Sequence, residues 1–336
     1  MMENIKVCVT GAAGYLGSSL VHKLLEKGYT VHATLRNLGD ATKVELLKSL
    51  PYADTRLVLF QADIYNPDEF AQAIQGCQVV FHLATPLQHN TQTSQYKNTS
   101  EAAVAGVKSI ADSCIKSGTV KRLIYTASVT ASSALKDDGN GYKDFMDETC
   151  WTPLNVSFRY ATDFLMAYVH SKTLAEKEAL SYNDGNKLEV VSLVCGLVGG
   201  YTRQSSVAGS IAVLISQITK DMPTYRTLRF LEEEIGKVPI VHIEDVVEAH
   251  IFCMENTGFV GRFLCASDLL KSAEIAALVQ SNWPDITIPD EFIEDSKREI
   301  KWGSTKLEEL GFQYKYDAEI AISDTLQVFR GIQQNA

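Results

Sequence analysis

The sequence lacks the cysteine spacing of a disulfide framework or of a metal site. Its seven cysteines are scattered and odd in number, and no two of them form a Cys-x-x-Cys pair. No cysteine–histidine cluster has zinc-site spacing, so we predict no metal. Reduced thiols that mostly fill the core are typical of a cytoplasmic protein, and we expect that location.

Long apolar runs and an excess of basic residues are also missing. No run approaches the roughly 20 apolar residues that span a bilayer, and no basic leader with a long apolar region opens the chain. The 336 residues carry a formal net charge of −10, with 31 Lys and Arg against 41 Asp and Glu. An acidic surface repels phosphate backbones. We therefore expect no membrane span and no nucleic-acid partner.

The first half of the sequence alternates strand and helix patterns. Short apolar or β-branched runs predict strands, and stretches of helical periodicity predict the helices between them. The predicted strands cover 5–10, 30–35, 57–62, 78–84, 122–126 and 188–194. The predicted helices cover 15–27, 41–50, 67–75, 101–117 and 163–182. This alternation indicates an α/β fold with a doubly wound parallel sheet of the Rossmann type.

The pattern loosens in the second half. Residues 136–158 are rich in Gly, Asp, Asn and Pro and predict a long loop, which in a compact domain usually serves function, for example as a pocket wall. We expect residues 1–200, with a strand and helix near 236–252, to form mainly the dinucleotide-binding domain. Residues 201–336 are expected to form mainly a smaller substrate-binding lobe that is interwoven with it.

A glycine-rich turn follows the first predicted strand and opens the first helix. Gly11 permits a tight turn, Gly14 lets the backbone approach a pyrophosphate, and Gly17 lets the helix pack closely on the sheet. Backbone N–H groups at such a helix N-terminus hold phosphates well. The turn also contains Tyr15 and Leu16, and its spacing is GxxGxxG rather than GxGxxG. It predicts a dinucleotide site.

The end of the second predicted strand distinguishes NADP from NAD. A carboxylate there would bind the ribose 2′-hydroxyl and repel a 2′-phosphate. This chain has Arg36 instead, 19 residues after Gly17, and Lys43 seven residues later. A guanidinium clamps a phosphate with two hydrogen bonds and stacks on adenine. We predict NADP(H) as the cofactor; the alternative is a solvated surface arginine, and Asp40 nearby weakens the basic character.

Tyr168 and Lys172 lie four residues apart in a predicted helix and so share one face of it. An ammonium one turn from a phenol lowers the phenol's pKa from its usual value of about 10. Tyr168 can then donate a proton to a carbonyl oxygen while a cofactor hydride attacks the carbon. Lys172 would also hold the nicotinamide ribose. Ser128, just past the fifth predicted strand, can hydrogen-bond the same oxygen and stabilise its developing charge.

The residues alone leave alternatives for this site. Tyr-x-x-x-Lys also occurs on ordinary amphipathic helices. Ser128 has hydroxyl neighbours that would serve equally well, namely Thr126, Thr130, Ser132 and Ser133. His170 lies two residues from both Tyr168 and Lys172, so it points to another face of the helix and is expected to pack or to lie at the surface.

Together these motifs resemble the extended short-chain dehydrogenase/reductases, and more narrowly the plant dihydroflavonol reductase, anthocyanidin reductase and vestitone reductase group. The resemblance covers nearly the whole chain. It is carried by TGAAGYLG at 10–17, VKRLIYTAS at 120–128, SKTLAEKEAL at 171–180, VHIEDVVEAHIF at 241–252 and STKLEELGFQYKYD at 304–317.

The resemblance implies roles for individual residues. It implies Ser128, Tyr168 and Lys172 as the catalytic set, and so favours Ser128 over the neighbouring hydroxyls. It implies a 2′-phosphate site at Arg36 and Lys43. Further cofactor contacts are implied at Asp63, Ile64, Leu83, Ala84, Thr85, Thr126, Cys195, Leu197 and Val198. For Asp63, the residues alone also allow a turn or helix-capping role.

Several positions depart from the pattern of this group. Cys195 and Tyr201 stand where its members commonly have prolines, and Ala127 replaces the middle serine of Thr-Ser-Ser. Ser133 stands at a substrate-facing position that is usually Asn in the dihydroflavonol reductases. These departures bear on the substrate and leave the cofactor and the proton donor unaffected.

The sequence thus predicts an NADP-dependent oxidoreductase that transfers the pro-S hydride of NADPH. The expected substrate is a ketone or conjugated carbonyl of an aromatic plant metabolite, flavonoid-like first and phenylpropanoid, polyketide or alkaloid next. Two alternatives are an NAD-dependent nucleotide-sugar epimerase, which Arg36 disfavours, and a non-catalytic NADP-binding sensor, which the Ser128–Tyr168–Lys172 set disfavours. We expect a monomer.

Overall fold

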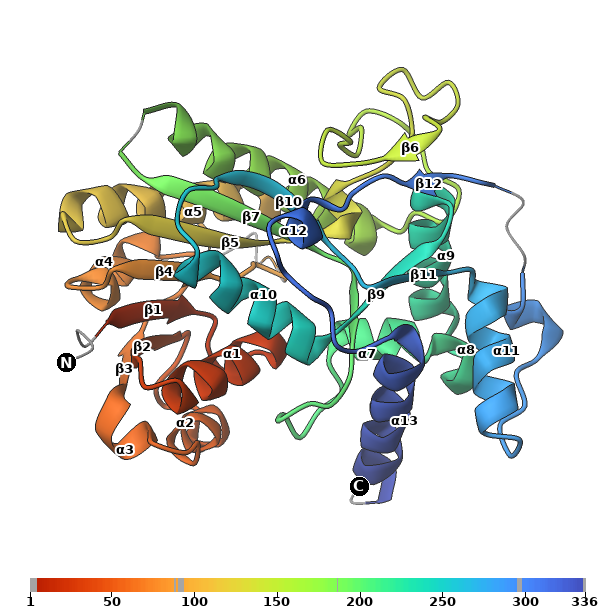
Figure 1. Ribbon diagram of the computed structural model, residues 1–336, viewed down its shortest axis with the longest axis horizontal. Coiled ribbons are helices and arrows are strands. Elements are labelled where there is room, and N and C mark those ends of the chain that lie inside the picture. The colour runs from red at the N-terminus through yellow and green to blue at the C-terminus, as the bar shows by residue number, and fades with distance from the viewer. Residues whose placement is uncertain (1–4, 88, 90–93, 186, 295–297, 335–336) are drawn as a thin grey trace. The chain divides into compact units, whose positions relative to one another are not determined.

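The computed structural model describes residues 5–87, 89, 94–185, 187–294 and 298–334 (Figure 1). The chain divides into two compact units. Unit 1 comprises Met1–Ala127, His170–Leu193 and Val247–Arg262. Unit 2 comprises Ser128–Val169, Val194–Val246 and Phe263–Ala336.

A seven-stranded sheet with the order β10-β7-β5-β4-β1-β2-β3 organises unit 1. Its strands are β1 (Lys6–Thr10), β2 (Thr30–Leu35), β3 (Leu57–Gln61), β4 (Val79–His82), β5 (Arg122–Ser128), β7 (Glu189–Cys195) and β10 (Gly261–Cys265). The pairs β1–β2, β2–β3, β1–β4 and β4–β5 are parallel. The strand order reverses between β1 and β4, and ligands of such sheets bind outside the carboxyl ends of the strands at this reversal.

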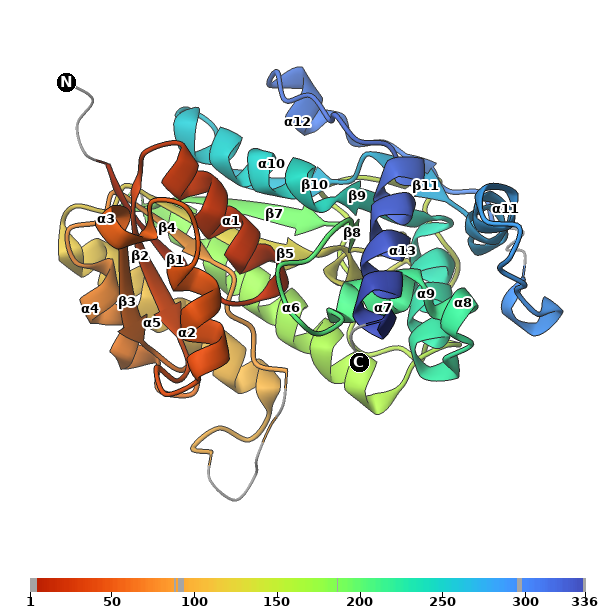
Figure 2. The ribbon, with the colours of Figure 1, turned by 90° about the horizontal axis from the view of Figure 1, so that it is seen from below.

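Helices cover both faces of this sheet. Figure 2 shows α1 and α10 on one face and α4 and α5 on the other. The helical segments are α1 (Tyr15–Glu26), α2 (Ala41–Lys48), α3 (Ala53–Arg56), η1 (Pro67–Glu69), α4 (Phe70–Ile74), α5 (Thr99–Ser117), α6 (Asp163–Ser181), η3 (Tyr182–Gly185) and α10 (Ile243–Glu255). The predicted doubly wound Rossmann architecture is confirmed.

Local chemistry explains why these elements begin and end where they do. The side chain of Asn98 caps α5 by accepting a hydrogen bond from Glu101 N at 2.9 Å. Gly118, with φ of +67°, ends the same helix in the left-handed conformation. The predicted strand and helix positions agree with the structure to within a few residues. One difference affects the site: Ser128 is the last residue of β5 and does not follow it.

Unit 2 contains two small sheets. The first has the order β11-β9-β8, in which β8 (Leu197–Gly199) runs parallel to β9 (Val238–His242), and β11 (Asp268–Leu270) is antiparallel to β9. The second pairs β6 (Phe145–Met146) with β12 (Lys301–Trp302). The loop predicted at 136–158 therefore contains one short strand. The helical segments are η2 (Val129–Ala131), α7 (Gly209–Leu214), α8 (Ser216–Thr219), α9 (Met222–Ile235), α11 (Ser272–Asn282), η4 (Asp290–Phe292), α12 (Lys306–Glu309) and α13 (Ala318–Gln334).

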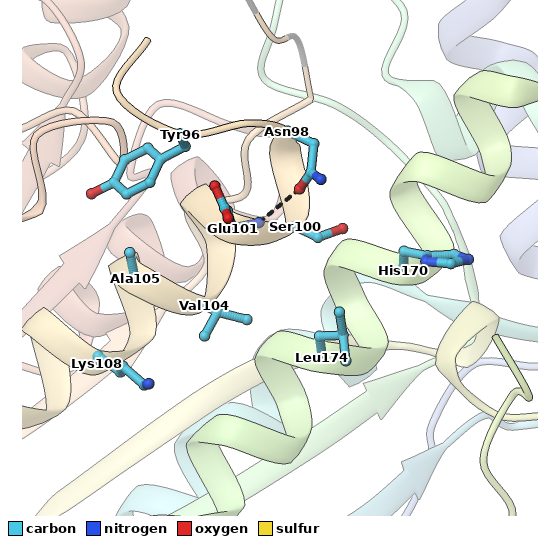
Figure 3. Close-up of a pocket in the computed structure, with 9 residues that line it drawn as sticks. All are labelled: Tyr96, Asn98, Ser100, Glu101, Val104, Ala105, Lys108, His170 and Leu174. Atoms are coloured by element: carbon cyan, nitrogen blue, oxygen red, sulfur yellow. Dashed lines mark hydrogen bonds between the residues drawn. The ribbon is translucent and has the colours of Figure 1, made fainter. Parts of the chain in front are cut away.

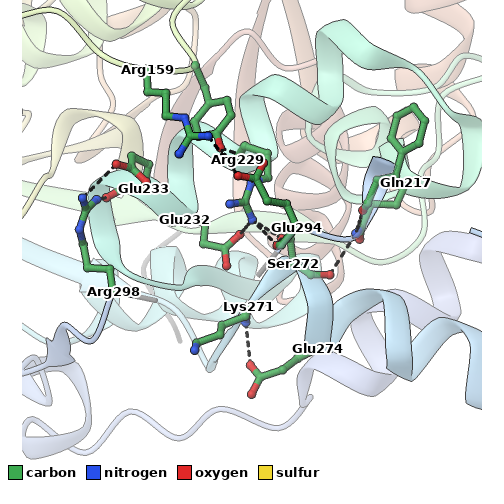
Figure 4. Close-up of polar contacts among 12 residues, drawn as sticks. Arg159, Gln217, Arg229, Glu232, Glu233, Lys271, Ser272, Glu274, Glu294 and Arg298 are labelled. Atoms are coloured by element: carbon green, nitrogen blue, oxygen red, sulfur yellow. Dashed lines mark hydrogen bonds and ion pairs between the residues drawn. The ribbon is translucent and has the colours of Figure 1, made fainter. Parts of the chain in front are cut away.

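A buried polar cluster on α9 holds the segments of unit 2 together (Figure 4). The guanidinium of Arg229 pairs with the buried carboxylate of Glu232 and donates to Ser272 Oγ at 2.6 Å and to Glu294 O at 2.7 Å. The Glu294 carboxylate accepts from the Tyr160 hydroxyl at 2.9 and 3.0 Å. Tyr160 lies just ahead of α6, so this cluster connects the approach to that helix with the C-terminal part of the chain.

No helix within the described residues has both the length and the apolar character needed to cross a membrane.

Candidate active site

The glycine-rich turn between β1 and α1 is too tightly packed for side chains at two of its positions. Gly11 has φ of +66°, and a Cβ there would lie 3.0 Å from Ala84 N. A Cβ on Gly17 would lie 2.3 Å from Gly11 O, so glycine is required at both positions. Gly14 precedes α1 in extended conformation and has no side chain to cap the helix. An anionic group of a ligand can take that capping place, so the turn fits a dinucleotide's pyrophosphate.

The neighbouring end of β4 is fixed by one hydroxyl group. Thr10 Oγ1 accepts hydrogen bonds from Leu83 N at 3.0 Å and from Ala84 N at 3.1 Å. It also lies 2.8 Å from His82 Nδ1. Burial, with the charge of Lys172 as a second cause, lowers the pKa of His82 to about 3. The ring is therefore neutral, and because Thr10 Oγ1 accepts two N–H groups, its own proton is donated to His82 Nδ1.

Sequence reasoning missed Thr10 and His82. Leu83 and Ala84 were predicted as cofactor contacts, but the two polar residues that hold their backbone were not singled out. Each ends a strand, and β1 and β4 are neighbours whose register pairs Thr10 with His82. The signal for Thr10 and His82 was available in the sequence. Each is a polar residue near the end of a predicted strand, and ligands of such sheets bind where the strand order reverses.

The predicted 2′-phosphate residues lie at the end of β2 and on α2. Arg36 is exposed and directly follows β2. Lys43 Nζ is 3.1 Å from the Asp40 carboxylate, which also caps α2 by accepting from Lys43 N at 3.2 Å. Hydrogen bonding to Lys43 lowers the pKa of Asp40. Lys43 is thus already paired, and a phosphate that binds it must compete with Asp40.

The predicted cofactor contacts Asp63 and Ile64 follow β3. Asp63 Oδ1 accepts from Tyr65 N at 3.0 Å, while Asp63 N donates to the Glu69 carboxylate at 2.9 Å. This geometry is that of a turn residue, the alternative weighed above. Ile64 is buried, and its side chain packs where a Cβ on Gly106 would otherwise lie. Thr85, the last of the predicted cofactor contacts at 83–85, donates from Oγ1 to Leu83 O at 3.4 Å.

Lys172 is buried, with 4% of its surface exposed, on the face of α6 that packs inward. Its ammonium donates to Thr126 O at 2.8 Å and lies 5.4 Å from the centroid of the Tyr125 ring. The next residue back, Ser171, donates to Thr99 Oγ1 at 3.0 Å. The lysine is therefore held in a defined place against the end of β5.

Ser128 and Tyr168 lie close enough together that hydrogen bonding with the Ser128 side chain lowers the pKa of the phenol. Ser128 Oγ also accepts from Thr130 N at 3.3 Å and from Thr130 Oγ1 at 3.0 Å. Burial raises the pKa of Tyr168, the bond with Ser128 lowers it, and Cys195 raises it. The predicted lowering of the phenol's pKa is therefore wrong for the protein without cofactor. The cost of desolvating a phenolate outweighs the favourable contacts.

The predicted residues Tyr15 and Leu16 open α1 in unit 1, whereas Cys195, Leu197 and Val198 lie in unit 2. Cys195 ends β7 and is buried beside Cys265, whose pKa it raises. Leu197 and Val198 form most of the short strand β8.

Ser133, the predicted substrate contact, is completely buried. Its hydroxyl donates to Glu234 Oε2 at 2.6 Å and accepts from Leu135 N at 2.9 Å. Ser133 therefore serves the packing of this segment.

A separate hollow of about 520 Å³ lies between α5 and α6 (Figure 3). Val104, Ala105 and Leu174 form its apolar wall, and His170 contributes to its rim. None of the nine residues that line it is a predicted catalytic or cofactor residue: Tyr96, Asn98, Ser100, Glu101, Val104, Ala105, Lys108, His170 and Leu174. His170 faces this outer side of α6, as its helical offset from Tyr168 and Lys172 predicts.

Comparison with known proteins identifies the class. The model of the NAD dependent epimerase/dehydratase family matches residues 7–263, and the chain belongs to this family. Within it, the chain falls in the plant dihydroflavonol, anthocyanidin and vestitone reductase group, as the motifs predict. It is an oxidoreductase of a family that works with nicotinamide dinucleotides.

Three relatives illustrate the similarity. The chain is 36% identical to dihydroflavonol 4-reductase of Gerbera hybrida over 315 residues, which is 93% of this chain and 82% of that protein. It is 35% identical to a putative anthocyanidin reductase of Ginkgo biloba over 318 residues, 94% of this chain and 92% of the relative. The crystal structure of alfalfa vestitone reductase superposes with a TM-score of 0.77 at 32% identity, covering 97% of this chain and 99% of that one.

Proposed function

We propose that the protein is an NADPH-dependent reductase of a ketone or conjugated carbonyl in a flavonoid-like aromatic compound. The observation that carries this proposal is the proximity of Ser128 to Tyr168, which lies one helical turn before the buried Lys172 on α6. The substrate class follows from relatives that are named for dihydroflavonols and anthocyanidins.

The residues around the glycine turn fit the cofactor. Gly11 and Gly17 let the backbone of the turn pack closely on itself and on Ala84, and the N-terminus of α1 would hold the pyrophosphate. Arg36 and Lys43 would hold the 2′-phosphate, which is the group that separates NADPH from NADH. Lys172 would hold the nicotinamide ribose. The bound cofactor would supply the hydride.

Tyr168 is the proton donor of the proposed reaction. A carbonyl oxygen gains negative charge as its carbon is reduced, and a neutral phenol beside Ser128 can give it a proton. The raised pKa of Tyr168 keeps the phenol protonated at neutral pH, which is the form that reduction needs. The ammonium of Lys172 then stabilises the phenolate that remains.

Ser128 is the second group that contacts the substrate oxygen in this proposal. Its Oγ accepts from Thr130 N and Thr130 Oγ1, which orients the hydroxyl. An oriented donor stabilises charge that develops in the transition state without having to reorganise.

A substrate panel tests the proposal. Purified protein is supplied with NADPH and, in separate reactions, with a dihydroflavonol, a flavanone, an anthocyanidin, a phenylpropanal and an alkaloid ketone. Cofactor oxidation and product mass are followed. We expect turnover of at least one flavonoid-type compound. If every aromatic carbonyl is inert and a nucleotide sugar is epimerised with NAD, the proposal is wrong.

A further inference from the structure

The segment HIEDVVEAH at 242–250 has no part in the proposed chemistry, yet its polar residues His242, Asp245 and His250 are buried. Two of them hold the C-terminal part of unit 2. Asp245 accepts hydrogen bonds from Lys315 N and Tyr316 N at 3.0 Å, and the His242 ring stacks on Tyr316 with centroids 4.2 Å apart. His250, at the end of the segment, belongs to unit 1 and has different neighbours.

His250 is connected to the proposed catalytic lysine through a single residue. Its side chain is fully buried on α10, and Nε2 lies 2.8 Å from Thr126 Oγ1. The carbonyl of Thr126 in turn accepts from Lys172 Nζ at 2.8 Å. The hydroxyl and the carbonyl of Thr126 therefore join the imidazole to the ammonium.

Thr126 lies near the end of β5, whose register with β4 runs to the pair His82 and Tyr125, so Thr126 is the first residue of β5 past that pairing. On its other side, β5 is bonded to β7. The β-branched side chain of Thr126 has few rotamers, so a hydrogen bond to the hydroxyl also restrains the backbone that carries the carbonyl. Anchoring of the hydroxyl by His250 therefore adds to the sheet's own hold on the direction of that carbonyl.

Two further neighbours of Lys172, Tyr125 and His82, do not replace this anchor. The Tyr125 ring attracts the ammonium but does not fix its position along β5. His82 is neutral, because burial and the charge of Lys172 lower its pKa to about 3, and its Nδ1 already accepts from Thr10.

We propose that His250 is a positioning residue for Lys172: it fixes the Thr126 hydroxyl, and the Thr126 carbonyl then holds the ammonium where it serves Tyr168 and the cofactor ribose. His250 itself contacts neither substrate nor cofactor. The inference rests on the proposed function for its effect on catalysis, while the anchoring is a property of the protein without cofactor.

The first test measures the anchoring directly, without cofactor or substrate. Wild type, His250→Phe and Thr126→Val are treated briefly with acetic anhydride, and acetylation of Lys172 is quantified by peptide mass spectrometry against the exposed Lys108. We expect Lys172 to be acetylated several-fold faster in both variants, because its amine is released from the carbonyl. Unchanged protection of Lys172 in folded His250→Phe would overturn the proposal.

The second test uses kinetics and a matched control. His32 on β2 is another buried histidine of unit 1. Its Nδ1 lies 2.7 Å from the backbone oxygen of Ala73 on α4. We expect His250→Phe to lower kcat about tenfold, as a small misplacement of a catalytic group does. We expect the alkaline limb of the kcat profile to move to higher pH, because a displaced ammonium lowers the phenol's pKa less. His32→Phe should change neither.

Further variants separate positioning from general destabilisation. His250→Gln keeps an amide that can reach Thr126 and should recover part of kcat and the wild-type pH profile. The double variant His250→Phe/Thr126→Val should lose no more kcat than either single variant, because both substitutions break the same hydrogen bond. If His32→Phe loses as much kcat as His250→Phe, the role is merely structural. If wild type reduces no carbonyl, the proposed function fails while the acetylation test still decides on the anchor.

Discussion

Ser133 donates its hydroxyl to the carboxyl of Glu234 at 2.6 Å, and both side chains are buried in unit 2. Burial raises the pKa of Glu234 to about 7, although the bond from Ser133 acts in the opposite direction. Glu233 raises it further, while Arg298 and a hydrogen bond with Tyr142 lower it. A carboxyl group in this setting titrates near neutral pH, and its protonation state affects how stable the protein is.

The first prediction concerns stability against pH. Between the ordinary glutamate pKa of 4.5 and the folded value of about 7, the folded state binds more protons than the unfolded one. The free energy of unfolding therefore falls as pH rises through this window, by about 3 kcal/mol for Glu234 alone. Glu234→Gln should remove that fall. Urea unfolding at pH 5 and pH 8 measures it, with the exposed Glu291→Gln as control. An equal fall in wild type and Glu234→Gln would contradict the prediction.

The second prediction concerns the proton donor. Tyr168→Phe should bind NADPH nearly as wild type but reduce the carbonyl about 10²- to 10⁴-fold more slowly, the usual contribution of a positioned acid. Cofactor affinity by fluorescence titration and single-turnover reduction rates separate the two effects. Tyr182→Phe is the matched control, since Tyr182 is a surface residue that bonds Asp112 at 3.1 Å. Turnover by Tyr168→Phe at the rate of Tyr182→Phe would remove Tyr168 from its role.

The third prediction concerns cofactor choice at the end of β2. Arg36 is exposed and available to a 2′-phosphate, and a charge-assisted hydrogen bond to such a group contributes about 1.5 to 3 kcal/mol. Arg36→Ala should therefore weaken NADPH binding at least tenfold and leave NADH binding nearly unchanged. Calorimetric titration with both cofactors checks this. Equal losses for both would show that Arg36 is an ordinary surface residue.

The fourth prediction follows from the pairing of Lys43 with Asp40 at 3.1 Å. Asp40→Asn removes the competing negative charge and keeps a side chain that can cap α2. NADPH should bind more tightly by a few-fold, and NADH should be unaffected. The gain should shrink at high salt, because exposed charges are screened. Unchanged NADPH affinity at low salt would mean that Lys43 does not reach the phosphate.

Some of this molecule was predictable from local sequence patterns. The alternation of apolar strands with stretches of helical periodicity predicted the doubly wound sheet, because both patterns act over a few residues. The glycine turn was equally predictable, because Gly11 and Gly17 lie where a predicted strand meets a predicted helix.

Contacts between distant residues were not predictable in this way. Thr126 and His250 are 124 residues apart, and Ser133 and Glu234 are 101 apart. Which side chains meet depends on how the strands order in the sheet and how the helices pack on it. The pKa of Tyr168 was predicted with the wrong direction for the same reason, because spacing along a helix reveals a neighbouring lysine but not the burial of the phenol.

The hydroxyl of Thr10 also has a consequence for engineering. It takes the N–H groups of Leu83 and Ala84 and gives its proton to His82, so one side chain sets the backbone beside the glycine turn. Arg36 lies at the end of a different strand. Redesign of cofactor preference at Arg36 therefore leaves the hydrogen bonds of Thr10 unchanged. Replacement of Thr10 by a residue without a hydroxyl would weaken the binding of NADPH and NADH alike.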